Sequence, residues 1–383
     1  MSMKTLSKKM LAVVVAGAMT MGLAMPAFAE GAGEGTTNKV TKAYISKTYN
    51  TEVGKAMKFN FTATQDTTST GLVTSAVTCT IPSISFTENE KGTTKKVSDS
   101  EITFATFNEA GKYEYTVKET ESDPVITDSA HEKLLMSKAE YKMTVYVVED
   151  TAGAFKVDHI AVNKTKNDEG NPAEGKVDIG GNVDSNTFNF VNTYVQEAGT
   201  GPNPSTPDPT YNDNGALKVS KTIVANGGTL DTEKTFDFTA TFAFPKGTNA
   251  STLGGVKGNG TDVSLTGNTC TFTLKHGDKM KFTGLPVGTT ITVKETGAAN
   301  YKGSASVVLD GATATPVAAG KYHEDLTAVT NGRLGQNTNT VDVTNTYNNV
   351  PTTGIIMNTL PYVLMIALCG AALFGFVAFK RRR

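Results

Sequence analysis

Three short motifs, each with one side chain that can take part in acyl or proton transfer, occur twice in the chain and in the same order. They are a lysine in Ser-Lys-Thr (Lys47 and Lys221), a glutamate in Thr-Val-Lys-Glu (Glu119 and Glu295) and an asparagine in Asn-Thr-Tyr (Asn192 and Asn345). The separation between copies is nearly equal for the lysine and glutamate motifs and shorter for the asparagine motif. This repetition indicates a duplicated fold whose first copy has extra residues before its last motif.

These three side-chain types can react with one another if a fold buries them together. Burial lowers the pKa of lysine and raises the pKa of glutamic acid, so an uncharged amine can exist at neutral pH. That amine can attack the asparagine side-chain carbonyl while the glutamate polarises the amide and shuttles protons. Fixed placement can replace an external catalyst, since effective molarities of ~10⁵ M or more are available to well-placed pairs. The products are ammonia and a Lys–Asn isopeptide bond. Each glutamate is the catalytic group of this reaction.

β-strands are the elements that must position these groups. Side chains alternate between the two faces of a strand, so Lys47 lies on the same face as Ile45 and Tyr49. A single lysine in such a place usually extends its head group to water, but the joint repetition favours burial. Lys42, in Val-Thr-Lys, fits the first lysine motif nearly as well. We prefer Lys47 because Ser-Lys-Thr recurs in the second copy.

Composition and patterning predict an all-β fold. The chain has no Trp and is rich in Thr, Val, Gly and Asn, and short alternating strand patterns fill residues 38–195 and 216–349. Two tandem β-sandwich domains follow from this pattern. Residues 196–215 contain four prolines at near-alternate positions and predict an extended, semi-rigid linker. Only residues 129–137 hint at a helical turn.

Other kinds of chemistry have little support in the sequence. The four histidines lack metal-ligand spacing, and no phosphate loop, dinucleotide fingerprint or nucleophile elbow is present. We therefore expect no metal, no cofactor and no turnover enzyme. Of three cysteines, Cys79 and Cys270 fall one in each domain, which leaves no disulfide framework within a domain. An isopeptide crosslink would supply the missing covalent constraint, at roughly 4–5 kcal/mol for a loop of more than a hundred residues.

The two ends of the chain carry targeting signals. Residues 1–29 combine a basic start, an apolar run and Ala-Phe-Ala, as in a secretory signal peptide. Residues 350–383 begin with Val350, Pro351, Thr352, Thr353 and Gly354, continue with an apolar helix at 360–379 and end in four basic residues. That helix is long enough to cross a bilayer. The two ends contain basic residues but no acidic residue, so their removal leaves an exported chain with a net negative charge. This charge argues against nucleic-acid binding.

The C-terminal pentapeptide, helix and basic tail resemble the LPxTG-type sorting signal of Gram-positive surface proteins, with Val350 in place of leucine. The resemblance implies that a sortase cleaves between Thr353 and Gly354 and joins Thr353 to an amine. Residues 360–379 would then hold the chain in the membrane only transiently. The location implied is the cell wall or pilus surface of a Gram-positive bacterium.

The glutamate-bearing segments, 111–119 and 285–295, resemble those of CnaB-type domains in Gram-positive sortase-assembled pilins. The whole chain is similar to the two-domain streptococcal backbone pilin. This family implies that both sandwiches are Ig-like, of the CnaB type. It also implies self-formed Lys–Asn bonds with a catalytic glutamate, and covalent polymerisation of identical subunits into a shaft. The implied partners are a pilin-type or housekeeping sortase, further copies of the chain, minor pilins and the peptidoglycan precursor.

A backbone pilin also needs a lysine that accepts the threonine of the next subunit, shortly before the last strand of its first domain. Lys176 is the nearest match, although residues 177–186 separate it from that strand. Lys164 and Lys166 are alternatives, although the pattern around each favours an ordinary solvated surface lysine. This departure and the long linker leave a second interpretation open, a minor pilin or a monomeric wall-anchored adhesin that binds a host ligand.

Overall fold

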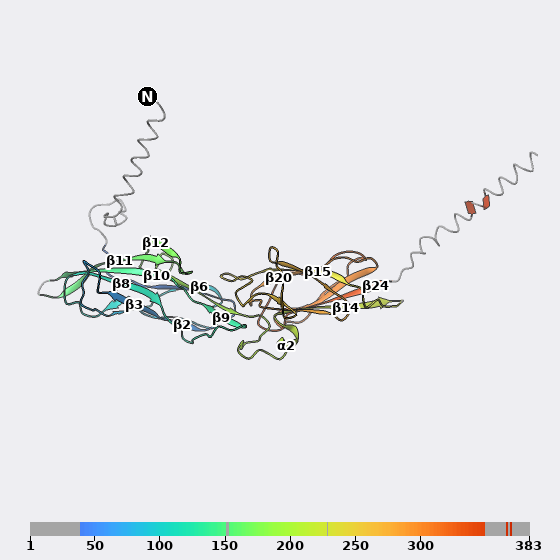
Figure 1. Cartoon of the computed structure of the whole chain (residues 1–383), viewed down its shortest axis with the longest axis horizontal. Coiled ribbons are helices and arrows are strands. Elements are labelled where there is room, and N and C mark those ends of the chain that lie inside the picture. Colours follow the sequence, from blue (N-terminus) through green and yellow to red (C-terminus); the bar gives the residue numbers. More distant parts are fainter. Residues whose placement is uncertain (1–38, 151–152, 228, 349–364, 367, 370–383) are drawn as a thin grey trace, which may run out of the picture.

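The computed structural model describes residues 39–150, 153–227, 229–348, 365–366 and 368–369. The described part of the chain is almost entirely β-structure, as two sandwiches arranged end to end (Figure 1). The expected all-β class with tandem sandwich domains is therefore confirmed. The predicted signal peptide and the motif at 350–354 lie outside the described residues, as does most of the apolar run 360–379. Within the described ranges, no helix is long and apolar enough to span a membrane.

The first domain contains two facing sheets and two small strand pairs. Its main sheets have the orders β6-β1-β13-β9 and β12-β11-β10-β8-β3, and the pairs are β2-β5 and β4-β7. Large aromatic residues such as Tyr49, Tyr141 and Phe190 are completely buried between the sheets. The strands are β1 (Ser46–Thr51), β2 (Met57–Phe59), β3 (Phe61–Asp66), β4 (Cys79–Thr80), β5 (Ile84–Phe86), β6 (Gly92–Val97), β7 (Thr103–Phe104), β8 (Gly111–Glu119), β9 (Glu132–Leu135), β10 (Glu140–Glu149), β11 (Phe155–Lys166), β12 (Pro172–Lys176) and β13 (Asn189–Gln196).

The second domain repeats this plan with fewer strands. Its sheets have the orders β17-β16-β19-β14-β24-β21-β22 and β18-β15-β20-β23. Its core is built from Phe236, Phe238 and Phe242 with aliphatic residues of both sheets. The strands are β14 (Leu217–Asn226), β15 (Phe236–Ala243), β16 (Lys257–Gly258), β17 (Thr261–Asp262), β18 (Thr269–Leu274), β19 (Lys279–Thr283), β20 (Thr290–Glu295), β21 (Tyr301–Val308), β22 (Thr315–Val317), β23 (Leu326–Arg333) and β24 (Thr340–Asn348).

In each domain the first and last strands are parallel neighbours. β1 pairs with β13, so that Tyr49 lies opposite Asn192 in the register. β14 pairs with β24, so that Ile223 lies opposite Asn345. The lysine of each first strand is two residues before this position and therefore lies on the same face of the sheet. The two ends of each domain are thus joined side by side through one ladder of hydrogen bonds.

Two local expectations differ from the structure. The helical turn expected at 129–137 is wrong, because Glu132–Leu135 form β9 and pair antiparallel with β13. In the Pro-rich segment 196–215, residues 196–201 are buried and do not form an exposed spacer. Within this segment only Tyr211–Asn214 are helical, as the short helix α2.

Residues 196–201 instead dock onto the second domain through their backbone. Ala198 N–H donates to the Leu285 carbonyl, and Val287 N–H donates to the Gln196 carbonyl. Gly199 has a φ of +77°, and a Cβ there would clash with the carbonyl oxygen of Gly215. The Gly-Thr-Gly sequence therefore permits a close backbone approach that a larger residue would prevent. The junction between the domains is a packed interface.

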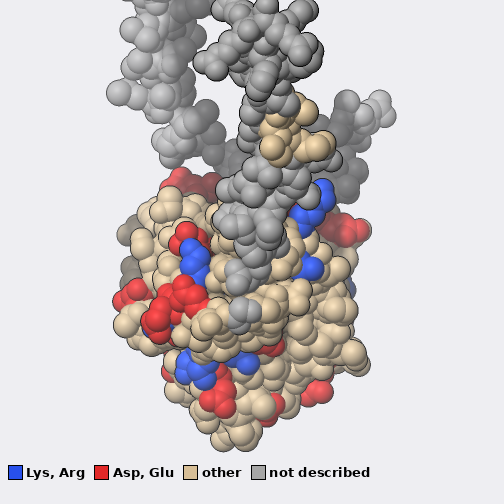
Figure 2. Space-filling model, turned by 90° about the vertical axis from the view of Figure 1, so that its right-hand side faces the viewer, with Lys and Arg blue, Asp and Glu red and all other residues tan. Residues whose placement is uncertain are grey.

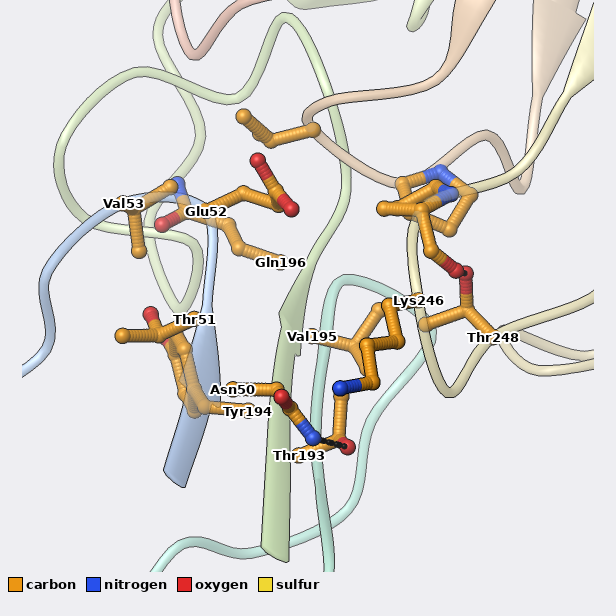
Figure 3. A pocket seen from close by; sticks show the side chains of 13 residues that line it. Asn50, Thr51, Glu52, Val53, Thr193, Tyr194, Val195, Gln196, Lys246 and Thr248 are labelled. Carbon is orange, nitrogen blue, oxygen red and sulfur yellow. Dashed lines mark hydrogen bonds between the residues drawn. The ribbon is translucent and has the colours of Figure 1, made fainter. Parts of the chain in front are cut away.

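A small cavity of about 10 Å³ lies in this interface, between the ends of β1 and β13 and the loop at 245–248 (Figure 3). Asn50 Nδ2 donates to Thr193 Oγ1 over 3.1 Å beside it, and Lys246 extends toward Thr193 from the second domain. An ion pair between Arg333 and Glu52 also joins the two domains. The cavity has room for about one water molecule and is a packing feature of the junction.

Charges on the face of the molecule seen end-on are mixed. Lysine or arginine and aspartate or glutamate side chains lie near one another among mostly uncharged residues (Figure 2). Most ion pairs of the described residues are of this surface kind, such as Lys39 with Asp158 and Lys166 with Glu140. Exposed pairs of this type add little to stability. Two other ion pairs are buried in the domain interiors, and both involve the repeated motifs.

Candidate functional site

Lys47, Glu119 and Asn192 meet in the interior of the first domain and are called the N-terminal cluster. Lys47 Nζ donates to Glu119 Oε1 over 2.7 Å, and Asn192 Nδ2 donates to the same oxygen over 2.8 Å. The Lys47 and Glu119 side chains are 0% exposed, and Asn192 is fully buried as well. A lysine amine and an asparagine amide therefore share one carboxylate oxygen in a site closed to water.

Lys221, Glu295 and Asn345 form the same arrangement in the second domain and are called the C-terminal cluster. Lys221 Nζ donates to Glu295 Oε1 over 2.7 Å, and Asn345 Nδ2 donates to that oxygen over 2.5 Å. The Lys221 and Glu295 side chains are 0% and 3% exposed. Both sets of side chains that the sequence motifs single out are thus brought together by the fold.

Each cluster is assembled from both sheets of its sandwich. The lysine and the asparagine come from the parallel first and last strands of one sheet. The glutamate is the last residue of a strand in the facing sheet, β8 in the first domain and β20 in the second. Because the core side of each strand faces the opposite sheet, the three side chains can meet only in the space between the sheets. The strand pairing therefore sets the backbone positions from which the three side chains extend.

Apolar walls surround the two amines. Lys47 Nζ lies 4.4 Å from the centre of the Phe59 ring, and Lys221 Nζ lies 4.1 Å from the centre of the Phe236 ring. Burial lowers the pKa of Lys47 to about 8 and that of Lys221 to about 8, although the neighbouring glutamates oppose the shift. Amines with such pKa values lose their proton far more readily than an exposed lysine does.

The pKa of each glutamate is raised for the same reason. Burial raises the pKa of Glu119, against the opposing effects of Lys47, Asn192 and the Ser137 backbone. Burial likewise raises the pKa of Glu295 against the effects of Lys221 and Asn345.

The second carboxyl oxygen of each glutamate, Oε2, is buried without a hydrogen-bond partner among the described residues. An unpartnered oxygen of this kind disfavours the ionised form, so transfer of a proton from lysine to glutamate is accessible within each pair.

The Asn192 amide has further contacts from the segment that follows β9. Ser137 N–H donates to Asn192 Oδ1 over 2.7 Å, and Asn192 Nδ2 lies 3.4 Å from Met136 Sδ. The Asn345 Oδ1 atom has no hydrogen-bond partner among the described residues. The sequence motifs did not identify Met136 or Ser137, because they lie in the segment that was interpreted as a helical turn.

The alternative first lysine, Lys42, lies elsewhere. Its amine is 3.0 Å from Glu101 Oε2 on the surface, and its side chain is 64% exposed. Hydrogen bonding to Glu101 raises the pKa of Lys42, which is the opposite of what a nucleophilic amine needs. Of the two candidates, only Lys47 contacts Glu119.

The candidate acceptor lysines lie on the last two strands at one side of the five-stranded sheet, Lys176 in the edge strand β12 and Lys164 and Lys166 in its neighbour β11. Lys176 is the exposed last residue of the edge strand β12 and lies opposite Asn163. Lys166 Nζ is bound to Glu140 Oε1 over 2.8 Å, and Lys164 Nζ lies 3.9 Å from Asp168 Oδ2. The cleavage residues Val350, Pro351, Thr352, Thr353 and Gly354 lie outside the described residues.

Metal and thiol chemistry find no support in the described part of the chain. No group of three or more histidine, cysteine, aspartate or glutamate residues is arranged to hold a metal there. Cys79 and Cys270 are free thiols in β4 and β18, and burial raises the pKa of both. Neither thiol is therefore activated as a nucleophile.

Several solved pilus proteins align over most of the chain. The major pilin from Streptococcus pyogenes is 19% identical, with 81% of this chain and 100% of that chain covered and a TM-score of 0.32. The T-13 major pilin from Streptococcus pyogenes is 17% identical (82% and 99% covered, TM-score 0.29). The pilus-presented adhesin Spy0125 (Cpa) is 11% identical (80% and 99% covered, TM-score 0.26). No curated protein matches the chain significantly.

Two domain families match the chain, one for each sandwich. Residues 39–195 match the Spy0128-like isopeptide containing domain, and residues 215–347 match a domain of unknown function, DUF7601. The match over residues 39–195 confirms the resemblance to isopeptide-containing pilins that the sequence motifs indicated. The second domain carries the same side-chain cluster although its own family has no assigned function.

Proposed function

We propose that this chain is a structural subunit of a sortase-assembled pilus on a Gram-positive bacterium, and that it forms the shaft. The observation that carries the proposal is the presence of two buried Lys–Glu–Asn clusters, each bridging the first and last strands of its domain. The chain modifies itself once in each domain and does not turn over a substrate. Its sorting signal at 350–354 then links it to its neighbours.

The self-modification is a transamidation within each cluster. The lysine passes a proton to the glutamate, and the resulting amine attacks Cγ of the asparagine. The Nζ–Cγ bond forms, and the protonated glutamate gives its proton to Nδ2, which leaves as ammonia when the Cγ–Nδ2 bond breaks. The carboxylate then takes the second proton from Nζ, so that the isopeptide nitrogen keeps one hydrogen and the glutamate ends protonated. In both clusters the glutamate oxygen already contacts the amine and the leaving amide nitrogen, so one group can serve as base and then as acid. No external reactant is needed.

The intact mass of the recombinant chain 30–353 tests the self-modification. We expect a mass that is short of the sequence mass by two ammonia molecules, one for each cluster. Glu119→Gln should restore one ammonia and Glu295→Gln the other, because each change removes one proton shuttle and keeps the shape of the side chain. Glu101→Gln is the matched control, since Glu101 forms a lysine pair at the surface. A full sequence mass for the unsubstituted chain would contradict the proposal.

Gel analysis of cell-wall extracts tests the shaft role. A shaft subunit should give a ladder of covalent multimers in denaturing gels, whereas a single wall-anchored band would favour the adhesin interpretation. We further propose Lys176 as the acceptor of the next subunit's Thr353, because it is exposed at a sheet edge before the last strand of the first domain. Lys176→Arg should remove the ladder and leave the monomer, while Lys166→Arg should not. A ladder that persists in Lys176→Arg would refute this assignment.

A further inference from the structure

The hydrogen bonding of the asparagine carbonyl oxygen differs between the two clusters. In the N-terminal cluster this oxygen, Asn192 Oδ1, accepts a hydrogen bond of 2.7 Å from Ser137 N–H. In the C-terminal cluster the corresponding atom, Asn345 Oδ1, is buried without a partner among the described residues. Gly303 lies beside Asn345, and a Cβ built there would be 3.1 Å from Oδ1. Because glycine has no side chain, residue 303 places no side-chain donor next to this oxygen.

Strand pairing explains the difference. In the first domain the antiparallel pairing of β9 with β13 ends at Leu135 opposite Thr193, so the following residues leave the ladder. Ser137 N–H is then available to the Asn192 side chain. In the second domain the pairing of β21 with β24 continues past the asparagine, with Gly303 opposite Asn345. Backbone N–H groups in a continuous ladder are used between strands and do not turn toward a side chain.

We propose that the backbone N–H of Ser137 is the oxyanion donor of the N-terminal cluster, and that the first domain consequently forms its crosslink faster than the second. This inference rests on the proposed self-modification and identifies a group that acts in it. Attack of Lys47 Nζ on Cγ moves an electron pair onto Asn192 Oδ1. When ammonia leaves, that pair returns to re-form the carbonyl.

A donor at this atom lowers the barrier because the oxygen gains charge only as the reaction proceeds. Effective donors lie 2.7–3.1 Å from the oxyanion position, and loss of one typically costs about 10²–10³ in rate. The Ser137 hydrogen bond is already at such a distance in a buried site. In the second domain the charge would develop on an oxygen that no described donor contacts.

Asp168 holds the donor in position. Ser137 Oγ donates to Asp168 Oδ1 over 2.6 Å, and Val191 N–H donates to the same oxygen over 2.8 Å. One carboxylate oxygen therefore ties the donor segment to the residue that precedes Asn192. Ala139 N–H also donates to Ser137 Oγ over 3.1 Å, which fixes the turn that aims Ser137 N–H inward.

The test replaces a single backbone N–H in the chain 30–353. Ser137 is replaced by its α-hydroxy acid counterpart, which exchanges the N–H for an ester oxygen and keeps the side chain. The matched control is the same exchange at Lys138, whose N–H donates to the Asp168 carbonyl and does not contact Asn192. Samples are taken after a short pulse of synthesis and quenched in acid. Ammonia loss is then followed for each domain by mass spectrometry of proteolytic fragments.

We expect the unsubstituted first domain to lose ammonia before the second. The exchange at Ser137 should slow the first domain by about 10²-fold and leave the second unchanged, while the exchange at Lys138 should have little effect. An unchanged rate after the Ser137 exchange would overturn the oxyanion proposal alone. Absence of ammonia loss from either domain of the unsubstituted chain would instead overturn the self-modification.

A folding defect is separated from a chemical one by a second comparison. The Ser137 exchange is made in the Lys47→Ala background, where no crosslink can form in the first domain. Thermal unfolding of this protein is compared with that of Lys47→Ala alone and with the Lys138 exchange in the same background. Similar melting temperatures for the two exchanges assign the slower reaction to the lost donor. If the melting temperature is much lower for the Ser137 exchange but not for the Lys138 exchange, the slower reaction is assigned to misfolding and the proposal is refuted.

Discussion

Asn192→Ala isolates the contribution of the first crosslink to stability. The substitution removes the electrophile and keeps the ion pair between Lys47 and Glu119, so no buried charge is left without its partner. The crosslink would close a loop of about 145 residues between Lys47 and Asn192, for which the chain-entropy relation gives about 5 kcal/mol at 25 °C. For a domain of this size, that loss corresponds to a decrease in melting temperature of roughly 10–20 °C.

Differential scanning calorimetry of the chain 30–353 can measure this effect. The variant should show one transition at lower temperature for the first domain, and its mass should be higher by one ammonia after allowance for the substitution. Asn50→Ala is the matched control, since Asn50 is a buried asparagine of the same sheet whose amide bonds Thr193 and Thr93. Deleting it removes comparable hydrogen bonds, at about 1–3 kcal/mol, without touching the crosslink.

The comparison between the two variants decides the result. Suppose that Asn192→Ala lowers the free energy of unfolding no more than Asn50→Ala does, while the mass shows that the unsubstituted chain contained the crosslink. The entropic account of the crosslink's contribution to stability is then wrong. If the unsubstituted chain keeps both ammonia molecules, the bond does not form.

Three further predictions concern force, pH and the nucleophile. In single-molecule pulling from both ends of the second domain, Asn345→Ala should add an extension of roughly 400 Å, because about 120 residues at ~3.4 Å each would no longer be bypassed; an equal extension for both proteins would contradict this. Hydrogen bonding to Glu197 raises the pKa of His131 above 6.5 at the domain junction. The His131 contribution to stability should therefore be complete below about pH 6 and be lost as the pH rises through the raised value. The melting temperatures of the unsubstituted chain and His131→Ala should accordingly differ more at low pH than at high pH, and a difference independent of pH would rule this out. Lys221→Arg should keep one ammonia, because a guanidinium remains protonated and cannot attack the amide; loss of both molecules would show that another amine reacts.

The repeated motifs and strand alternation are sufficient to predict which side chains approach one another. Lys47 shares a strand face with the buried residues Ile45 and Tyr49, and its own side chain is buried in the structure. Alternation alone could not separate Lys47 from Lys42, because both lie in similar patterns. The distinction depends on where β1 begins, at Ser46, and on its register with β13. Register is a tertiary property that a single sequence does not contain.

The surroundings of Asn192 could not be predicted in the same way. Residues 129–137 include Glu-Lys-Leu-Leu-Met, which are good helix formers, yet Glu132–Leu135 form a strand along β13. Pairing with the exposed edge of β13 outweighs a weak local preference. The same applies to residues 196–201, where proline-rich composition downstream suggested an open spacer. Their burial depends on backbone contacts with the second domain that no side-chain pattern records.

The parallel pairing of first and last strands relates the chemistry of each cluster to its mechanical consequence. In the second domain the chain enters at Leu217 and leaves at Asn348, at opposite ends of two neighbouring parallel strands. Tension applied at those ends shears one strand against the other and loads the ladder between them directly. A bond between Lys221 and Asn345 would lie directly across that shear plane and would transmit the load without stretching the rest of the domain. The pairing that brings an amine and an amide close enough to react is therefore also the pairing that most needs the covalent bond.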